Sequence, residues 1–389
     1  MRPGARVQAA IEVLDAVFAG AAAERALTGW ARGARYAGSK DRAAVRDHVF
    51  DALRRLRSSA WAGGLGDVAP EAMNGRQVMA GLLAGQGADL ATLFDGSGHA
   101  PAPLDRMPDP GPAPEAVALD LPDWLLDRLR ATLGADADPV AAALRDRAPV
   151  ILRVNTGKTT RPVLIDRLVA VGHAADAHSL SPTAVTVEGA PRGLTALPEF
   201  EMGHFELQDA GSQAVIDRLP EAARVLDLCA GGGGKALAYA ARTGAEIIAH
   251  DADPARMRDL PVRAARAGAG IETTTTPEAL APFDGIIADV PCSGSGSWRR
   301  APEAKWRLTP ERLSELTSLQ DTIIDRAVTM LAPGGWLAYV TCSLLREEND
   351  ARIEAAQDRH PGLVRGLRWE TTPLDGADGF HLSLLGRPA

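Results

Sequence analysis

Two cysteines follow two apolar segments that have the composition of buried strands. The segment FDGIIADV at 283–290 runs into Pro291 and Cys292, and the segment GWLAYVT at 335–341 runs into Cys342. Parallel strands of an α/β sheet end at one common edge, where such folds bind ligands. A single free cysteine is most often a buried apolar residue. Two thiols that both follow strand ends instead indicate a reactive site.

A pair of thiols at such an edge suits chemistry on a pyrimidine ring. Carbon 5 of cytosine is a poor nucleophile, but a thiolate that adds to C6 makes C5 enamine-like and able to attack a sulfonium methyl group. The C5 proton must then leave so that the thiol can be eliminated, which gives a second group a role. A free thiol has a pKa of about 8.5, so the attacking sulfur needs a basic or polar environment. The base must also leave its stack to reach the pocket, where Asp289 can hydrogen-bond its N3/N4 edge.

A glycine loop lies upstream of these thiols. It follows the apolar segment RVLDL, opens a helical segment, and is expected to contact a cofactor through Cys229, Ala230, Gly231, Gly232, Gly233, Gly234 and Lys235. Glycines let the backbone pass close beneath a ligand. A second strand ends about 20 residues later at Asp251, which is placed to bind ribose hydroxyls. This spacing suits NAD, a nucleotide or AdoMet, and it does not match a P-loop.

The composition is that of a globular protein with more than one domain. The chain has 389 residues, of which 46% are apolar and 24% charged, and its net charge is −8. Three widely spaced cysteines make neither a disulfide framework nor a zinc site. We expect no membrane span, no bound metal and no signal peptide, because acids interrupt the first apolar stretch at helical spacing. The cytoplasm and a monomeric state are therefore predicted.

The charge is unevenly distributed despite the negative total. The first sixty residues hold eleven Arg and Lys side chains against six acids, and a second basic run contains Arg299, Arg300, Lys305 and Arg307. Binding to phosphates depends on where arginines cluster and not on the net charge. Either cluster is equally compatible with a solvated helix face.

The periodicity of apolar residues divides the chain into three parts. Residues 1–148 show helical spacing over 5–60, 71–84 and 122–146, with a Pro/Gly-rich linker at 93–116. Residues 149–205 contain the strand-like runs VILRVN and AVTVEGA, which predict a small α+β segment. In residues 206–389, strands alternate with helices at 254–267 and 309–331, which predicts a parallel α/β sheet covered on both faces.

Several motifs in this order resemble the RsmB/NOP family of RNA cytosine-C5 methyltransferases. They are LRVNT at 152–156, FELQDAGSQ at 205–213, the loop at 227–235, DVPCSGSG, RRAPEAKW, LTSLQ and LAPGGWLAYVTCSLLREEN. The resemblance covers about 120–389. Around DRAAVRDHVFDALRRL, the N-terminal part resembles the helical NusB-like RNA-binding domain of the bacterial 16S rRNA member. The implied fold is a Rossmann-like class I AdoMet-dependent methyltransferase domain, preceded by a small α+β RNA-binding segment and the helical domain.

The resemblance also implies residue roles. Cys342 is expected to attack C6, Cys292 to assist product release, and Asp289 to contact the base and the cofactor. The cofactor AdoMet is expected on the loop from Cys229 to Lys235 and on Asp251. RNA, with 16S rRNA as the implied substrate, is expected at Arg153, Asn155, Arg299, Arg300 and Lys305.

This sequence departs from the family pattern at three places. The loop reads CAGGGGK instead of CAAPGGK, and so it lacks a proline that stiffens the turn. Thr273–Thr276 stand where the family has an acid near the adenine, and His381 stands where an aromatic residue is usual. The first two departures predict weaker binding of AdoMet.

Two other functions compete with RNA methylation. DNA cytosine-C5 methyltransferases attack with the cysteine of a Pro-Cys motif, here Cys292, but they also use a Glu-Asn-Val motif that this chain lacks. That function leaves Cys342 unexplained. The other alternative is a non-catalytic RNA-binding ribosome-assembly factor that has retained a methyltransferase fold. The altered glycine loop favours it, and the presence of both cysteines and Asp289 argues against it.

Overall fold

The structure is a computed structural model that describes residues 1–189 and 191–388. It divides into two compact units. The helical unit contains Met1–Arg147 together with Trp298–Leu308, and the α/β unit contains Ala148–Ser297 and Thr309–Ala389. The sequence predicts a boundary near residue 148. It does not predict that the chain contributes a later segment, Trp298–Leu308, to the helical unit.

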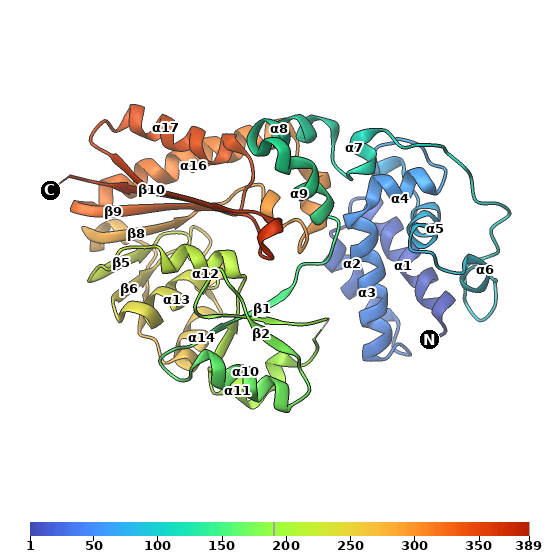
Figure 1. Cartoon of the computed structure of the whole chain (residues 1–389), viewed down its shortest axis with the longest axis horizontal. Helices are drawn as coiled ribbons and strands as arrows, with labels where there is room; N and C mark the ends of the chain where they lie inside the picture. Colours follow the sequence, from blue (N-terminus) through green and yellow to red (C-terminus); the bar gives the residue numbers. More distant parts are fainter. Residues whose placement is uncertain (190, 389) are drawn as a thin grey trace. The chain divides into compact units, whose positions relative to one another are not determined.

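The helical unit is built of amphipathic helices (Figure 1), and its buried residues between Val7 and Phe94 form one apolar core. Its main helices are α1 (Pro3–Phe18), α2 (Ala23–Gly33), α3 (Ser39–Arg54), α4 (Leu56–Ala62), α5 (Gly75–Gly85), α8 (Asp123–Leu133), α9 (Ala137–Ala143) and α15 (Pro302–Arg307). The short helices α6 (Leu90–Leu93) and α7 (Glu115–Ala118) flank the Pro/Gly-rich linker. The helical character predicted for the first 148 residues is confirmed.

A four-stranded antiparallel sheet begins the α/β unit. Its strands are β1 (Val150–Val154), β2 (Ala175–Ala177), β3 (Ala184–Val187) and β4 (Phe205–Leu207), in the order β2-β3-β1-β4. The helices α10 (Arg161–Ala170) and α11 (Pro198–Glu201) belong to the same segment, and its core includes Leu152, Leu164 and Phe205. The predicted small α+β segment is therefore present.

The larger sheet of the α/β unit has seven strands in the order β10-β11-β9-β8-β5-β6-β7. The strands are β5 (Arg224–Asp227), β6 (Glu246–Ala249), β7 (Ile271–Thr273), β8 (Phe283–Asp289), β9 (Leu331–Thr341), β10 (Val364–Thr371) and β11 (Phe380–Gly386). The pairings among β9, β8, β5, β6 and β7 are parallel, whereas β11 pairs antiparallel with β9 and with β10. The sheet is thus mixed, not wholly parallel as predicted. The largely exposed strand β10 was not predicted, because VRGLRWET lacks the apolar run of a buried strand.

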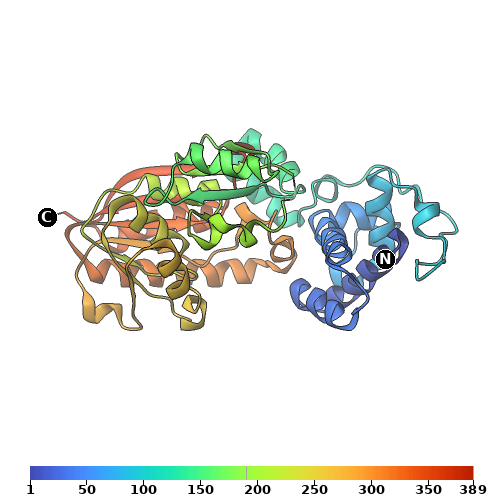
Figure 2. The ribbon, with the colours of Figure 1, turned by 90° about the horizontal axis from the view of Figure 1, so that it is seen from below.

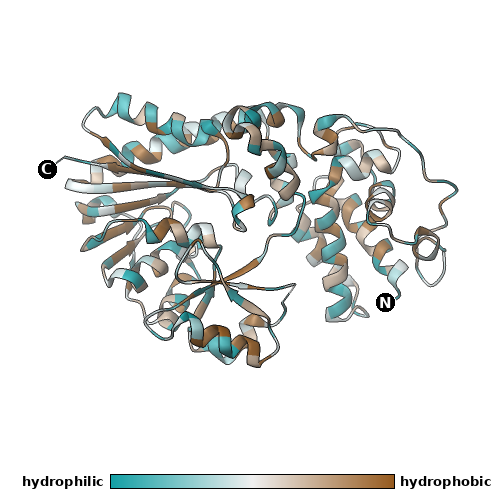
Figure 3. Ribbon diagram, in the orientation of Figure 1, coloured by the Kyte–Doolittle hydropathy of each residue, from teal (hydrophilic) through white to brown (hydrophobic). Residues whose placement is uncertain are grey.

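Helices cover both faces of this sheet (Figures 1 and 2). Helices α16 (Pro310–Met330) and α17 (Asp350–Arg359) pack on one face, against Leu226, Ile286 and Leu337. Helices α12 (Ala210–Asp217) and α13 (Gly234–Thr243) pack on the other, against the alternate neighbours Val225, Ile287 and Ala338. Successive strand residues point to opposite faces, so strands buried on both sides become apolar throughout. Figure 3 shows the strands mainly apolar and the outward surfaces of α16 and α17 mainly polar.

The helix predicted at 254–267 is divided. Residues Pro254–Met257 form one 3₁₀ turn, and α14 (Leu260–Ala267) begins after it. Proline lacks an N–H group and fits only the first turn of a helix, so Pro261 sets the start of α14. In contrast, the helix predicted at 309–331 is continuous as α16, where the side chain of Thr309 caps the N-terminus by accepting from the backbone N–H of Arg312. None of the helices within the described residues has the length and apolar character needed to cross a bilayer.

Candidate active site

The glycine loop joins β5 to α13 in a backbone conformation that requires glycine. Gly231 has φ +50° and Gly233 has φ +77°, and a Cβ atom on Gly233 would lie 2.1 Å from the Leu260 side chain. Any other residue at these positions would be strained. The carboxylate of Asp251, which follows β6, accepts a hydrogen bond of 2.9 Å from the backbone N–H of Gly231. The loop and the acid predicted to bind the cofactor therefore lie side by side.

Burial changes the chemistry of two residues at the start of this loop. Asp227 is 1% exposed, and burial raises its pKa to about 7. One oxygen accepts from the backbone N–H of Ala236, while the other has no hydrogen-bond partner. Burial likewise raises the pKa of Cys229 to about 12, so this cysteine remains a thiol at neutral pH.

Lys235 and Asp289 form a close ion pair. The ammonium group of Lys235, at the start of α13, lies 2.5 Å from a carboxylate oxygen of Asp289 at the end of β8. The lysine is 7% exposed and also lies over the ring of Phe380. The pair joins the glycine loop to the strand that leads into Cys292.

The two cysteines that follow β8 and β9 are in direct contact. Their sulfur atoms are 3.4 Å apart, and the hydroxyl of Ser297 lies 3.8 Å from the sulfur of Cys342. The pKa of Cys342 is lowered, first by the hydrogen bond from the Cys292 thiol and further by Ser297 and the positive charge of Lys235. The pKa of Cys292 is raised well above its usual value by the same bond, by burial and by the negative charges of Cys342 and Glu348. The arrangement favours a thiolate on Cys342 beside a neutral thiol on Cys292.

Two of the residues predicted to contact RNA are buried inside the α/β unit. Arg153 is 6% exposed and donates hydrogen bonds to the side chain of Gln208 and to the backbone oxygen of Gly234. Asn155 is 8% exposed and donates to the backbone oxygens of Gly203 and Ala267. These bonds join the small sheet to the glycine loop and to α14. Both residues therefore act as internal supports here, and contact with RNA stays a prediction for them.

The other predicted RNA contacts lie in the helical unit. Lys305 is 1% exposed, its ammonium group lies 3.4 Å from the backbone oxygen of Arg54, and burial lowers its pKa to about 8. Arg299 is also buried, and its backbone oxygen accepts from the guanidinium of Arg54. Arg300 is exposed. Only Arg300 has its side chain at the surface of this unit, so for Arg299 and Lys305 an RNA contact would require the packing to open.

The sequence predicted no role for three residues that hold the thiols in place, although they lie within the family-like motifs LTSLQ and LREEN. Glu348, Asn349 and Gln320 are buried and form hydrogen bonds with the loops that contain Cys292 and Cys342. Glu348 and Asn349 belong to the family-like run LREEN. Nothing in that run distinguishes a buried acid from the neighbouring Glu347, which is only partly buried.

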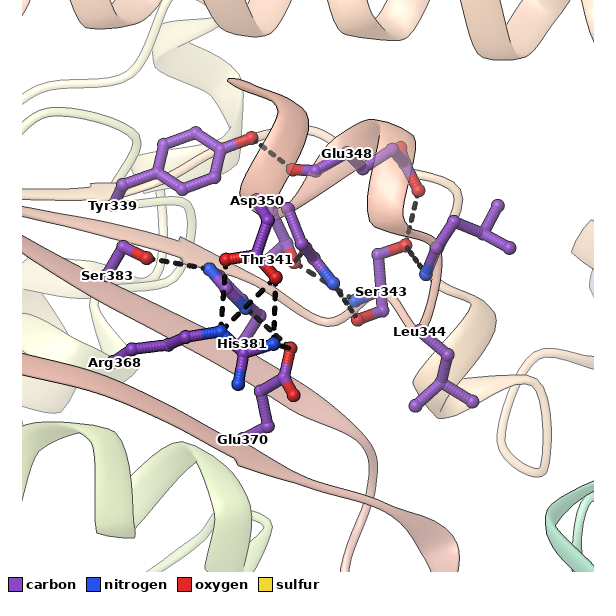
Figure 4. A network of polar contacts seen from close by, with 12 residues as sticks. Tyr339, Thr341, Ser343, Leu344, Glu348, Asp350, Arg368, Glu370, His381 and Ser383 are labelled. Carbon is purple, nitrogen blue, oxygen red and sulfur yellow. Dashed lines mark hydrogen bonds and ion pairs between the residues drawn. The ribbon is translucent and has the colours of Figure 1, made fainter. Parts of the chain in front are cut away.

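His381 takes part in a polar cluster beside the thiol loops, in which His381 is buried, Asp350 half-buried and Glu370 exposed (Figure 4). Its ring nitrogens lie 2.9 Å from Glu370 and 2.9 Å from the hydroxyl of Ser383. Asp350, Glu370 and His381 could together offer three metal ligands. However, Arg365 and Arg368 already pair with Asp350, and Arg368 also contacts Glu370. The cluster therefore works as a charge-compensated support of β10 and β11, which explains a histidine in place of an aromatic residue.

The glycine loop, the Lys235–Asp289 pair and Asp251 fit the requirements of an AdoMet site. The close approach of the backbone at Gly233 and the acid after β6 are the features that such folds use for a nucleoside ligand. After β7, where the family pattern has an acid, Thr274 and Thr276 offer hydroxyl and backbone groups only. The fold and the site are those of a Rossmann-like, AdoMet-dependent methyltransferase.

Comparisons with known proteins agree with this class. Residues 215–378 match the family model of the 16S rRNA methyltransferase RsmB/F, and residues 121–192 match the ferredoxin-like domain of the same group. The chain belongs to the RsmB/F family, as the resemblance had predicted.

Curated relatives and solved structures are similar to parts or all of the chain. The ribosomal RNA small subunit methyltransferase B of Cronobacter sakazakii is 35% identical over 284 residues, 68% of this chain. That of Erwinia tasmaniensis is 33% identical over 282 residues. The match spans 66% of each relative's length, just under two thirds. The crystal structure of PH0851 has a TM-score of 0.80 at 22% identity and covers 99% of both chains. A methyltransferase homolog from Pyrococcus horikoshii has a TM-score of 0.61 at 25% identity, covering 70% of this chain and 97% of its own.

Proposed function

We propose that this protein transfers a methyl group from AdoMet to C5 of a cytosine in RNA, with 16S rRNA as its substrate. The observation that carries the proposal is the pair of sulfur atoms 3.4 Å apart at the ends of β8 and β9, with opposite shifts of pKa. Membership of the RsmB/F family supports RNA, and ribosomal RNA in particular, as the substrate.

In this proposal Cys342 is the nucleophile. Its sulfur forms a bond to C6 of the cytosine, and the electron pair of the C5–C6 double bond moves toward N3 and C4. Asp289 is placed to accept a hydrogen bond from the N4 amino group of the N3/N4 edge, and the positive charge of Lys235 beside it offsets the charge on the ring. The bound AdoMet supplies the electrophilic methyl group that C5 attacks.

The second thiol completes the cycle. After methyl transfer the proton at C5 must be removed, the C5–C6 double bond re-forms, and the C6–sulfur bond breaks. The Cys292 thiol, whose sulfur adjoins that of Cys342, is assigned to assist this release. Once Cys342 is bonded to C6, its negative charge no longer raises the pKa of Cys292. Cys292 then loses its proton to water and, as a thiolate, takes the C5 proton while Cys342 leaves as a thiolate. The same raised pKa argues against the DNA-methyltransferase alternative, in which Cys292 itself would attack.

The direct test is methylation of defined RNAs. The full chain is incubated with AdoMet and, in separate arms, with transcripts of 16S rRNA, 23S rRNA and tRNA, and the products are mapped by bisulfite sequencing. The proposal expects one protected cytosine in 16S rRNA. Protection only in tRNA or 23S rRNA would refute the substrate, and no C5-methylcytosine in any RNA would refute the reaction.

Calorimetry with AdoMet separates the enzyme from the assembly-factor alternative. We expect a measurable heat of binding, although weaker than in relatives with the proline-containing loop. Binding of RNA without any binding of AdoMet would favour the assembly factor.

A further inference from the structure

A single buried carboxylate joins the two loops that contain the cysteines. Glu348 lies at the end of a 3₁₀ turn, Arg346–Glu348, just before α17, and its side chain is fully buried. One oxygen accepts from the backbone N–H of Ser293 at 2.8 Å, and the other accepts from the hydroxyls of Ser293 and Ser343, both at 2.5 Å. Figure 4 shows Glu348 reaching Ser343 from this turn.

The two serines that Glu348 binds are the residues directly after the two cysteines. Ser293 follows Cys292, and Ser343 follows Cys342. One side chain therefore fixes the residue next to each sulfur, and the distance between the sulfurs depends on it. Loop backbone bonds, such as that from Gly296 N–H to the oxygen of Cys342, support the same geometry but carry no charge.

The carboxylate is satisfied by neutral donors alone. Its fourth hydrogen bond, at 3.1 Å, comes from the amide of Gln320 on α16, which also donates to the oxygen of Pro291. Among the described residues, no Arg, Lys or His forms an ion pair with Glu348. A buried carboxylate without a counter-ion acts over several ångströms, because water does not screen it.

The charge of Glu348 acts on the two thiols unequally. After the hydrogen bond to Cys342, burial and the charge of Cys342, it is a further cause of the raised pKa of Cys292. The leading charged groups that act on Cys342 are instead Asp289 and Lys235. Two thiols in contact cannot both ionise, so an electrostatic difference between their surroundings decides which one carries the charge.

We propose that Glu348 is a positioning residue that keeps Cys342 the nucleophilic thiolate and Cys292 the neutral thiol by binding Ser293 and Ser343 with one uncompensated carboxylate. The assignment of the two cysteines rests on the proposed function. The unequal reactivity of the two thiols does not depend on the proposed function, because it can be measured without RNA or AdoMet.

The test is alkylation of the native full chain by iodoacetamide, with the modified peptides quantified by mass spectrometry. In the unaltered protein we expect Cys342 to react about tenfold faster than Cys292, and Cys229 to stay unmodified. Glu348→Gln keeps the shape but removes the charge, and it should narrow the ratio of the two rates to about threefold or less. Glu347→Gln makes the same change one residue away and should keep the original ratio.

Two further measurements guard against a purely structural effect. Thermal unfolding identifies a Glu348→Gln protein that does not fold, in which case Ser293→Ala, which removes one hydroxyl and no charge, takes its place. Ser293→Ala should change the ratio in the same direction by a smaller factor. A folded Glu348→Gln protein with the original ratio, or an equal change in Glu347→Gln, would overturn the proposal.

Methyl transfer separates this proposal from the proposed function. If Glu348→Gln changes the alkylation ratio while the unaltered protein methylates no RNA, the positioning role stands and the proposed function fails. If RNA methylation by Glu348→Gln and its pH profile match those of the unaltered protein, the positioning role fails and the proposed function stands.

Discussion

The helical unit and the α/β unit both bury charged groups, but they compensate them differently. In the helical unit, Asp120 accepts from the backbone N–H and the hydroxyl of Ser58, lies 2.8 Å from the guanidinium of Arg145, and is stabilised by the charge of Lys305. Opposite charges therefore lie together in one cluster there, although burial still raises the pKa of Asp120. In the α/β unit, Asp227 has an oxygen without a partner, and Glu348 has only neutral donors.

This difference distinguishes buried charges that support the fold from buried charges that change the pKa of reactive groups. In the helical unit the opposite charges support the segment Trp298–Leu308, and they do not adjoin a thiol, since all three cysteines belong to the α/β unit. Unpaired buried carboxylates cost stability, yet they set the pKa values of neighbouring groups, which is how active sites prepare acids and nucleophiles. The following predictions test that contrast, beginning with the largest expected effect.

Removing the thiols should have the largest effect and should distinguish the two cysteines. Cys342→Ala should lower the rate of methyl transfer by about 10³-fold or more, because the thiol that remains, Cys292, has a pKa well above its usual value. AdoMet affinity should stay within about twofold. Cys292→Ala should instead leave the protein bound covalently to RNA, visible as a slower band on a denaturing gel. Exchanged phenotypes would mean that the two assigned roles are reversed.

Asp227 should make the α/β unit lose stability as the pH rises. Its pKa is raised from 3.8 to about 7 in the folded state, so the folded protein binds more protons than the unfolded chain between these values. The stabilisation is complete below about pH 4 and lost by about pH 7, and it amounts to about 4 kcal/mol. Hydrogen exchange in peptides of β5 and α13 should show this decline, and Asp227→Asn should flatten it. An unchanged decline in Asp227→Asn would contradict the assignment.

Lys305 should give the helical unit the opposite dependence. Its pKa falls from 10.5 to about 8, so the unfolded chain binds more protons between these values. The free energy of unfolding should therefore rise from pH 8 to pH 10.5, by about 3 kcal/mol. In Lys305→Met the rise should disappear while stability at pH 7 stays similar, because Arg145 still pairs with Asp120. Hydrogen exchange in peptides of α3 and α15 measures this rise in the free energy of unfolding. A rise that persists in Lys305→Met would mean that another group causes it.

The smallest expected effect concerns the charge beside Cys342. Lys235→Met removes a cation that lowers the pKa of this thiol, so less of it is thiolate at neutral pH. We expect iodoacetamide to modify Cys342 about tenfold more slowly at pH 7 and at a similar rate at pH 10. The matched variant Lys158→Met, on the surface of the same unit, should behave like the unaltered protein. Equally slow alkylation of Cys342 at pH 7 and pH 10 would indicate that Lys235→Met changes the geometry around this thiol and not its pKa.

The parts of the fold that could be predicted were those with a strong local pattern. Apolar runs such as IIAD and WLAYV predicted β8 and β9 because a strand covered by helices on both faces is apolar at every position. The position of Cys292 and Cys342 at one edge followed from the parallel arrangement. Strand β10 was missed because an exposed edge strand has no such pattern, and the direction of β11 was missed because direction is set by its pairing partner.

The predicted RNA contacts show what residue type leaves open. The structure buries the side chains of Arg153 and Lys305 against backbone oxygens, and it also buries Arg299, so contact with RNA stays a prediction for all three. A basic side chain looks the same in the sequence whether it faces a phosphate or a carbonyl group. The glycine loop was easier to predict, since glycine adopts the positive φ of Gly231 and Gly233 without strain.

The sequence by itself determined the order of the main helices and buried strands, the glycine loop and the placement of one thiol after each of two strands, because each depends on residues close together in the chain. Only the tertiary structure decided that the sulfurs touch, that Glu348 binds both loops, and that Lys305 is buried. Each of these depends on side chains tens to hundreds of residues apart, whose burial, and therefore whose charge, is set by packing.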